Sequence, residues 1–528
     1  MNIEHRASSI QHPAPRIAVI GGGVSGLAAA HRIVELLPGA ELTVFEASGR
    51  IGGVIDTFEQ DGFLVERSAD SFITKLPGAL DLCRRLGLAD ELVPTEESRR
   101  RALVVRDGRL LPVPDGFFLM LPRKLWPMLT TRVLSLRGKL RLLAELLVPP
   151  RQILEAGVGT GGSPVLATTG EPPVATVADE SVESFVCRRL GREVFERLVQ
   201  PLMAGIYTAD PAKLSMAATM PEFLAYERQH GSLLRATLTA GRGRESFATD
   251  ELSHLFEQPV AKDSRPRYAT TAAASGARYR LFVAPRQGMR GLIEALKNRL
   301  PSGSLRMNTR VSKIERLAGG EWQLTISGQP TLERYDGVIV ALPAFAAADA
   351  MKEFDAALAD ELATVPYAGC AVVSVALRAA QVRRPIDSFG FVVPHVEGRR
   401  IIAASFSSAK FAGRAPHDGL LIRVFVGGAL QPELMALPDN ELTRLVVEEL
   451  DGLLGIRNEP LWFDIARWPR SMPQYHVGHL ARVERIEQLV ECHPGLALAG
   501  NAYHGVGIPQ CIRSGEAAAE RMLAACRL

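Results

Sequence analysis

The sequence predicts an α/β protein, α+β overall, that begins with a strand–helix–strand unit. The β-branched run Ile17–Ile20 is typical of a buried parallel strand. It stops at the glycine-rich turn Gly21–Gly26, and Leu27–Leu37 then has the composition of a helix closed by a Pro-Gly pair. A second strand is expected at Glu41–Glu46. This order is a βαβ unit, in which two parallel strands are joined through a helix.

Further elements follow with less regular spacing. The stretches 157–176 and 241–279 are polar and lack periodicity, so we expect a flexible loop in the first and a polar insertion in the second. In later segments the apolar residues recur with the spacing that is typical of helices or strands. They predict a helix over Arg290–Leu300, strands over Val311–Ile314, Trp322–Ile326, Tyr335–Pro343 and Leu496–Gly500, and a last helix starting near Cys511.

Composition and charge exclude several classes of protein. The chain has 528 residues, 47% of them hydrophobic and 23% charged, which is ordinary for globular proteins and predicts two or three domains. A net charge of +3 is too small to indicate a nucleic-acid partner. The six cysteines are scattered without a C-x-x-C pair, which predicts neither a zinc site nor a disulfide framework.

The sequence carries no targeting or membrane-spanning pattern. Met1–Pro15 is polar and lacks the apolar core of a secretory signal. No run of about 18 apolar residues occurs, so a transmembrane helix is not predicted. With free thiols expected, these observations favour a cytoplasmic protein.

The glycine-rich turn predicts a dinucleotide site. Gly21, Gly23 and Gly26 fit G-x-G-x-x-G, in which the glycines allow a tight turn, approach to a pyrophosphate and close helix packing. The pyrophosphate would lie at the helix N-terminus, where backbone N–H groups favour negative charge. Glu46 could accept hydrogen bonds from an adenosine ribose and would repel a 2′-phosphate, which disfavours NADP. The following Arg50–Val54 segment either brings more backbone to the cofactor or is a simple turn.

Four segments carry a family resemblance. Gly21–Asp56, with GGG-x-SGL and E-x-x-x-R-x-GG, resembles the flavin-containing amine oxidase superfamily. Three further segments restrict this resemblance to one group within the superfamily. They are Phe63–Phe72, Pro201–Ser215 and Leu498–Gly515, which contain the runs ERSADSF, GIYTADP and AGNAYHGVGIPQ. Together the segments resemble the oxygen-dependent protoporphyrinogen/coproporphyrinogen III oxidases of haem biosynthesis.

The resemblance implies a Rossmann-like FAD-binding domain built from separated segments, a mixed-sheet substrate domain, and a helical part that could face a membrane. The boundaries expected are 16–90, 280–345 and 466–528 for FAD, 91–230 for a substrate and helical part containing the 157–176 loop, 241–279 for the insertion, and 346–465 for the substrate sheet.

The flavin contacts implied lie in six separate parts of the chain. With the residues that the glycine motif itself predicts, the FAD-binding set is Gly21, Gly22, Gly23, Val24, Ser25, Gly26, Glu46, Ala47, Arg50, Gly53, Val54, Ser68, Ala69, Asp70, Ser71, Val311, Met472, Gly500, Val506, Gly507 and Ile508.

The chemistry implied is a six-electron oxidation of a porphyrinogen, in which molecular oxygen becomes hydrogen peroxide. The flavin does the redox work, so no catalytic side chain is predicted. No metal is predicted either, because His476 and His479 lack a third ligand. The substrate's propionates call for a cation, and Arg101 is the candidate, while Gly205 matches a glycine of the family's substrate pocket or else ends a helix. Asp70 lies in the DSF form that resembles bacterial members acting on coproporphyrinogen, although protoporphyrinogen stays open.

Residues Phe117–Pro150 mix apolar and basic side chains, which suits either an interfacial helix for peripheral membrane contact or a core helix with a basic face. Two other functions stay open. One is a flavin amine oxidase or carotenoid-type desaturase, and the other is a non-catalytic nucleotide-binding protein.

Overall fold

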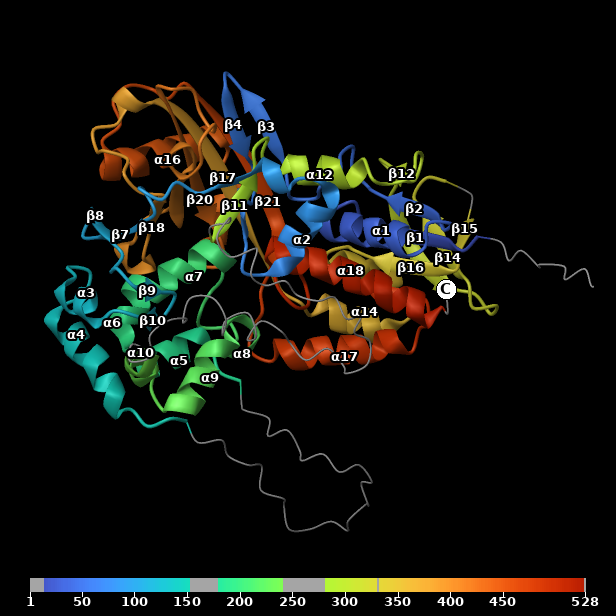
Figure 1. The fold of residues 1–528 in the computed structure, drawn as a ribbon, viewed down its shortest axis with the longest axis horizontal. Helices are drawn as coiled ribbons and strands as arrows, with labels where there is room; N and C mark the ends of the chain where they lie inside the picture. Colours follow the sequence, from blue (N-terminus) through green and yellow to red (C-terminus); the bar gives the residue numbers. More distant parts are fainter. Residues whose placement is uncertain (1–13, 152–178, 241–280, 330–331, 527–528) are drawn as a thin grey trace, which may run out of the picture. The chain divides into compact units, whose positions relative to one another are not determined.

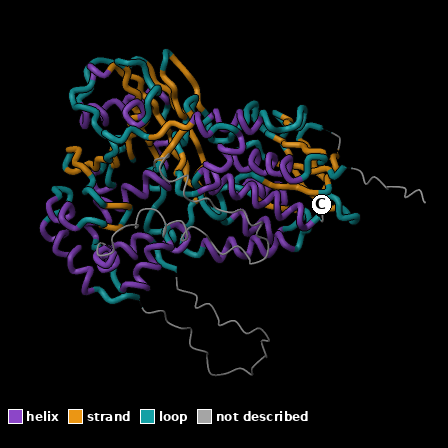
Figure 2. The backbone as a smooth tube through the Cα atoms, in the orientation of Figure 1, coloured by secondary structure: helices purple, strands orange, loops and turns teal. Residues whose placement is uncertain are grey.

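The computed structural model describes residues 14–151, 179–240, 281–329 and 332–526. Both expected insertions, 157–176 and 241–279, lie outside the described residues. The helices and strands are drawn in Figures 1 and 2. The chain forms two compact units. Among the described residues, unit 1 contains 14–95, 281–365 and 482–526, and unit 2 contains 96–151, 179–240 and 366–481.

A five-stranded parallel sheet forms the centre of unit 1. Its strands come from three distant parts of the chain. Strand β1 pairs with β2 on one side and with β16 on the other, and β16 pairs with β22. Ile17 and Val19 of β1 are fully buried, as expected for a strand covered on both faces. The order is β12 (Leu305–Arg306), β2 (Glu41–Phe45), β1 (Arg16–Ile20), β16 (Gly337–Val340) and β22 (Leu496–Leu498).

Helices from opposite ends of the chain cover this sheet. Figure 1 shows α1 (Val24–Leu36) beside α18 (Ile508–Ala525). Their contact requires a glycine, since a Cβ on Gly515 would lie 2.0 Å from the backbone oxygen of Ser25. The remaining helices of this unit are α2 (Pro77–Leu86), η1 (Ala89–Glu91), α12 (Arg290–Lys297), α13 (Ala344–Met351), α14 (Ala356–Ala363) and, from residue 482 onward, α17 (His479–Glu491).

Three small antiparallel sheets complete unit 1. They are β3 (Thr57–Gln60) with β4 (Phe63–Glu66); β5 (Phe72–Ile73), β11 (Phe282–Pro285) and β6 (Leu92–Pro94); and β13 (Val311–Arg316), β14 (Trp322–Ile326) and β15 (Leu332–Tyr335).

Unit 2 is built on a seven-stranded mixed sheet. Neighbouring strands are antiparallel except β7 and β18, which run parallel. Helix α16 (Asp439–Leu454) packs Leu442, Leu445 and Val446 into the same core as Val373 and Val375 of β17. The order is β21 (Trp462–Pro473), β17 (Tyr367–Arg378), β20 (Gly419–Gly427), β19 (Ala403–Phe406), β18 (Gly390–Val392), β7 (Ala102–Arg106) and β8 (Arg109–Pro112).

A helical region belongs to the same unit. It includes a continuous helical stretch from α6 through a π-helical turn to α7, which ends at Tyr207. The elements are β9 (Phe117–Phe118), β10 (Leu121–Pro122), α3 (Leu125–Thr130), α4 (Leu136–Leu143), η2 (Ala144–Leu147), α5 (Val182–Arg189), α6 (Arg192–Val194), η3 (Phe195–Val199), α7 (Gln200–Tyr207), α8 (Met216–Thr219), α9 (Pro221–His230) and α10 (Leu233–Ala240). The short elements of the sheet's loops are η4 (Ala379–Gln381), η5 (His395–Glu397), α15 (Ser407–Lys410) and η6 (Pro432–Ala436).

The α/β class and the mixed sheet are confirmed, as are the strands of the first βαβ unit. Two expectations change. The last helix begins at Ile508 rather than near Cys511, because Pro509 occupies its first turn. Residues Phe117–Pro150 do not form one helix, since two short strands, two short α-helices and a 3-10 helix divide them.

Candidate functional site

The glycine-rich turn between β1 and α1 is held by contacts that exclude side chains. Gly21 donates its N–H to Phe45 O at 2.8 Å and has a φ of +112°. A Cβ on Gly21 would lie 2.5 Å from Ala341 O, and one on Gly26 would lie 1.9 Å from Gly21 O. These two glycines therefore serve the fold.

Gly23 differs from its neighbours. A Cβ there would meet only Gly53 Cα, at 3.9 Å, so the space in front of this turn is open. Gly23 also caps α1 without any side-chain acceptor on the helix's first N–H groups. An open cradle with N–H groups at its floor fits the pyrophosphate of a dinucleotide.

The second glycine pair lies beside the first turn. Gly52 N–H donates to Gly22 O at 2.8 Å, which places the Arg50–Val54 segment next to the G-x-G-x-x-G turn. Arg50 fastens it by donating from Nη1 to Ile55 O at 3.0 Å and from Nη2 to Gly53 O at 2.6 Å. The segment is therefore more than a free turn, because it forms one wall of the cradle.

Glu46 is oriented by backbone and hydroxyl donors. Its Oε2 accepts from Gly22 N at 2.9 Å, and its Oε1 accepts from Ser48 N at 2.8 Å and Ser48 Oγ at 2.7 Å. Glu46 and Ala47 directly follow β2, at the carboxyl edge of the parallel sheet where ligands of such sheets bind.

The C-terminal segment adds a second helix start to unit 1. Gly500 N–H donates to Ser514 Oγ at 3.0 Å, and α18 begins at Ile508 with Gly507 as its N-cap and no side-chain cap. Val506 O contacts the Cys511 thiol at 3.8 Å, and burial raises the pKa of that thiol to about 12. The start of α18 therefore has N–H groups without a side-chain cap, and the thiol beside them is buried and un-ionised.

The other predicted flavin residues are placed as follows. Ser71 Oγ donates to Asp70 Oδ1 at 2.8 Å within the Ser68–Ser71 loop, and Val311 is the buried first residue of β13. These all belong to unit 1. Met472 belongs to unit 2, near the end of β21, where it pairs with Ala368.

The histidines have local partners. His504 Nε2 lies 2.8 Å from Glu487 Oε1, and this hydrogen bond lowers the pKa of the Glu487 carboxyl. The ring of His479 stacks on Tyr475 at 3.9 Å. Among the described residues no group of three or more potential ligands could hold a metal ion.

The two predicted substrate residues are both in unit 2. Arg101 donates to the side chain of Asp387 and, at 2.9 Å, to its backbone oxygen, so its guanidinium already has an anionic partner. Gly205 lies on the exposed side of α7 and does not end that helix, because the cap is Thr208 with a φ of +49°. A Cβ on Gly205 would meet only Val392 Cγ1, at 3.8 Å.

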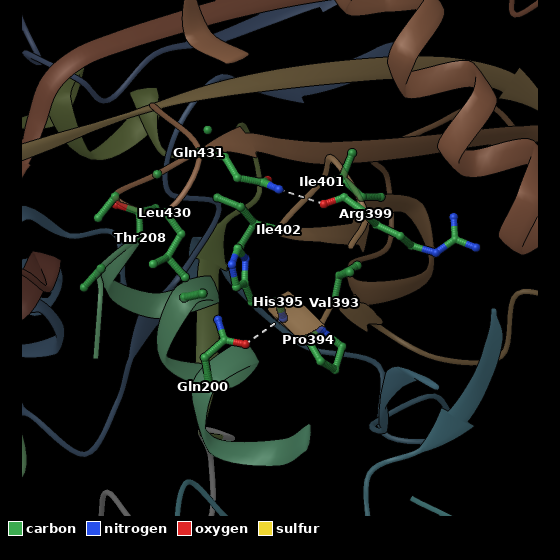
Figure 3. A pocket seen from close by; sticks show the side chains of 15 residues that line it. Gln200, Thr208, Val393, Pro394, His395, Arg399, Ile401, Ile402, Leu430 and Gln431 are labelled. Carbon is green, nitrogen blue, oxygen red and sulfur yellow. Dashed lines mark hydrogen bonds between the residues drawn. The ribbon is translucent and has the colours of Figure 1, made fainter. Parts of the chain in front are cut away.

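A small pocket is lined by residues of α7 and of the segments 393–402 and 427–431 (Figure 3). Gln200 Oε1 accepts the N–H of His395 at 2.8 Å on one wall, and Gln431 Nε2 donates to Arg399 O at 2.8 Å on another. Its volume of about 30 Å³ suits one or two water molecules and is far too small for a flavin or a tetrapyrrole.

Three residues of unit 1 that help to hold the candidate site in place were not predicted from the sequence. Gly52 fixes the second turn, Gly515 lets α18 approach α1, and Glu66 accepts the N–H of Met289 at 2.8 Å ahead of α12. The glycine in the alanine-rich stretch of α18 was a usable signal, because an unexplained helix glycine often marks close packing.

Comparison with known proteins shows the family to which the chain belongs. Residues 24–523 match the family model described as flavin containing amine oxidoreductase. The chain belongs to that family. The predicted flavin cofactor, FAD, and the assignment as an oxidoreductase are thereby confirmed.

Three relatives sharpen the resemblance. The chain is 32% identical to coproporphyrinogen III oxidase of Bacillus subtilis, over 95% of this chain and 96% of the relative. It is 33% identical to that of Propionibacterium freudenreichii, over 96% and 90%. A crystal structure from Exiguobacterium sp. 255-15, named "Putative protoporphyrinogen oxidase", superposes with a TM-score of 0.76 at 28% identity, covering 96% of this chain and 98% of that one. The predicted family resemblance is confirmed.

Proposed function

We propose that this chain oxidises a porphyrinogen to the porphyrin in haem biosynthesis, with coproporphyrinogen III as the preferred substrate. The similarity to two coproporphyrinogen III oxidases over nearly the whole chain carries the proposal. The open cradle at Gly23 and the uncapped start of α18 support it, because they fit FAD.

The overall reaction balances with oxygen as the oxidant. Six hydrogens leave the porphyrinogen, and three molecules of oxygen take them up as three molecules of hydrogen peroxide. Bound FAD supplies a two-electron acceptor, so three rounds complete one porphyrin.

The residues of the chain bind and orient. The N–H groups at the start of α1 would hold the pyrophosphate, and Glu46, fixed by Gly22 and Ser48, would accept from the ribose. The start of α18 would stabilise negative charge on the reduced cofactor through its free N–H groups and helix dipole.

The test is turnover by the purified yellow protein. Coproporphyrinogen III and protoporphyrinogen IX are supplied separately, and porphyrin fluorescence, oxygen uptake and peroxide are followed. We expect three peroxides per porphyrin and a higher kcat/KM with coproporphyrinogen III. A colourless preparation that takes up no FAD, or fluorescence no faster than oxidation by air, would contradict the proposal.

Arg101 and Gly205 are proposed to line the substrate site. Gly205 leaves open space on α7, which the tetrapyrrole substrate could occupy. Arg101 is proposed to hold a propionate in exchange for Asp387, whose carboxylate it now binds.

Membrane contact is proposed for the 117–150 region. Trp126, Leu136, Leu140 and Leu147 are 74%, 78%, 67% and 84% exposed, which is unusual for large apolar side chains. Arg137 and Lys139 flank the pair on α4, so the surface suits anionic lipid headgroups. No helix within the described ranges is long and apolar enough to span a membrane.

A further inference from the structure

The ionisable residues that line the small pocket of unit 2 (Figure 3) can carry only positive charge. They are His395 and Arg399, and no carboxylate is among the fifteen described residues of the lining. Arg399 Nη1 donates to Glu449 Oε2 at 2.7 Å, outside the lining, so the charge of this guanidinium is already balanced. Because metal cations such as Mg²⁺ and Ca²⁺ are bound mainly by carboxylate and other oxygen ligands, the lining disfavours a cation as the occupant.

Backbone oxygens on each of the three lining segments are already used. Each of them accepts a hydrogen bond from a backbone N–H group or, in one case, from a side-chain amide. They belong to Ala204 and Thr208 of α7, to Pro394, His395, Arg399 and Ile402, and to Gln431. The occupant of the pocket is therefore selected by the free donors that it meets.

Gln200 supplies the first free donor. The residue is only 6% exposed, and its Oε1 accepts the backbone N–H of His395 at 2.8 Å. A backbone N–H can only donate, so this bond fixes which end of the amide is the oxygen. Nε2 donates to no group in the described part of the chain, and Figure 3 shows it pointing into the space beside the His395 ring. An unused donor on a buried side chain is costly unless a ligand or water accepts from it.

The His395 ring supplies a second donor. Neither ring nitrogen forms a hydrogen bond with another described residue, and the ring lines the same pocket as Gln200 (Figure 3). A neutral imidazole donates through one nitrogen, and a protonated one donates through both. His395 is also exposed, so the pocket has a route to solvent through which a small ion can enter.

We propose that this pocket binds one monovalent anion of halide size, with chloride as the occupant. Gln200 Nε2 and the His395 ring donate to the ion. The apolar side chains of Val393, Ile401 and Leu430 keep water from the rest of the pocket, which strengthens the attraction between donors and ion. A volume of about 30 Å³, which suits one or two water molecules, accommodates one halide ion but not a tetrahedral oxyanion such as sulfate.

The experiment measures chloride binding to the FAD-loaded protein. Chloride replaces gluconate at constant ionic strength, and binding is followed by the line width of the chloride NMR signal. We expect a saturable broadening that bromide reverses and added sulfate does not. The measurement needs no porphyrinogen and no turnover, so its result is independent of the proposed function.

Gln200→Glu tests the first donor. The substitution keeps an oxygen that accepts the His395 N–H and replaces the amide nitrogen by a carboxylate oxygen, which repels an anion. We expect the Kd for chloride to rise at least about tenfold. Gln488→Glu is the matched control, because it makes the same charge change at an exposed position of α17 in unit 1, and it should keep the wild-type Kd. An unchanged Kd in Gln200→Glu overturns the proposal.

Two further measurements decide the matter if Gln200→Glu does not fold. His395→Leu changes an exposed ring, keeps the backbone N–H that Gln200 accepts, and should weaken chloride binding severalfold. Crystals soaked in bromide should show anomalous scattering within hydrogen-bond distance of Gln200 Nε2. A pocket that holds water alone would give no saturable broadening in wild type, and bromide found only elsewhere would place the ion at another site. Either result overturns the proposal, as does bromide at Gln200 without binding in solution, which would be an adventitious ion only.

Discussion

Two glycines in one turn meet different surroundings at the residue scale. A Cβ at position 26 would collide with Gly21 O, whereas a Cβ at position 23 would find only an ordinary contact with Gly53. Gly23 also has a φ of −73°, which alanine adopts without strain. Gly26 therefore serves packing, whereas Gly23 leaves room for a ligand.

This difference predicts opposite phenotypes. Gly26→Ala should destabilise the flavin-depleted protein by about 1–3 kcal/mol through overpacking. Gly23→Ala should unfold like wild type when depleted, but bind FAD at least about tenfold more weakly. Urea unfolding and FAD titration measure both quantities. Wild-type FAD affinity in Gly23→Ala would show that the pyrophosphate does not lie against this turn.

Glu222, in the first turn of α9, is a buried carboxyl. Burial raises its pKa from 4.5 to about 7. The folded protein thus binds this proton more tightly than the unfolded chain does. The stability contributed is fully present below about pH 4.5 and is lost as the pH rises through 7.

Glu222→Gln removes the titration and keeps the shape. At pH 8 we expect the variant to be more stable than wild type by up to about 3 kcal/mol, and at pH 5 nearly equal. Urea unfolding at both pH values measures this. The exposed Glu484→Gln on α17 is the control and should differ little from wild type at either pH. A pH-independent difference for Glu222→Gln would refute the interpretation.

A buried ion pair connects several elements of the helical region. Arg189 of α5 and Glu145 of η2 are both 0% exposed and contact each other directly. Glu145 also accepts Leu233 N at 2.9 Å and Leu234 N at 3.2 Å, which caps α10. Arg189 donates to Val148 O at 2.9 Å and to Gly231 O at 3.0 Å. The pair thus organises four elements.

Breaking this ion pair should lower the free energy of unfolding strongly. Arg189→Met leaves a buried carboxylate without its cation, so we expect a loss of about 3–5 kcal/mol in the free energy of unfolding. Arg192→Met removes an exposed pair with Glu183 and should cost less than about 1 kcal/mol. Chemical unfolding compares them. Equal losses would mean that burial does not set the energy of the pair.

The surface of α4 gives the membrane proposal its test. Leu136 and Leu140 are one turn apart and therefore share one exposed face. Leu136→Ser with Leu140→Ser should reduce cosedimentation with phosphatidylglycerol vesicles severalfold and leave solution turnover unchanged. Leu332→Ser, half-exposed in unit 1, is the control. Unchanged cosedimentation of the α4 variant would reject this face as the contact.

At the scale of the whole molecule, the proposed FAD cradle is discontinuous. Strand β1 pairs with β16, β16 pairs with β22, and α18 packs on α1. Adding FAD to depleted protein should therefore slow amide hydrogen exchange in both residues 16–56 and 496–515, far apart in sequence. Mass spectrometry of exchanged peptides measures this. Protection confined to only one of the two stretches would contradict the cradle.

Short-range chemistry made much of unit 1 predictable. The β-branched runs of β1 and β16 and the glycine turn have local causes, so their bounds agree with the structure to within a few residues. The 117–150 region was not predictable in this way. Its apolar and basic residues alternate as in a helix, but a residue with positive φ at Leu119 and Pro127 inside α3 accompany the division into short elements.

The candidate site divides along the same line. The motif predicted Gly21–Gly26 and Glu46 as dinucleotide contacts, because a dinucleotide makes the same demands on any βαβ unit. The motif could not predict that Arg50 donates hydrogen bonds to the backbone oxygens of Gly53 and Ile55, or that Asp387 binds Arg101. Those pairings join residues through folded turns and strands.

The family, the cofactor and the order of the first elements could be predicted from the residues alone, because they depend on residue types at short, fixed spacings. The tertiary structure alone decided which acceptors are left unsatisfied and which charges are neutralised. Gln474 Oε1 and the Arg189–Glu145 pair are the clearest cases. Burial and hydrogen-bond satisfaction are properties of packed neighbours, and these residues have neighbours that lie tens to hundreds of positions away along the chain, such as Tyr207 for Gln474 and Glu145 for Arg189.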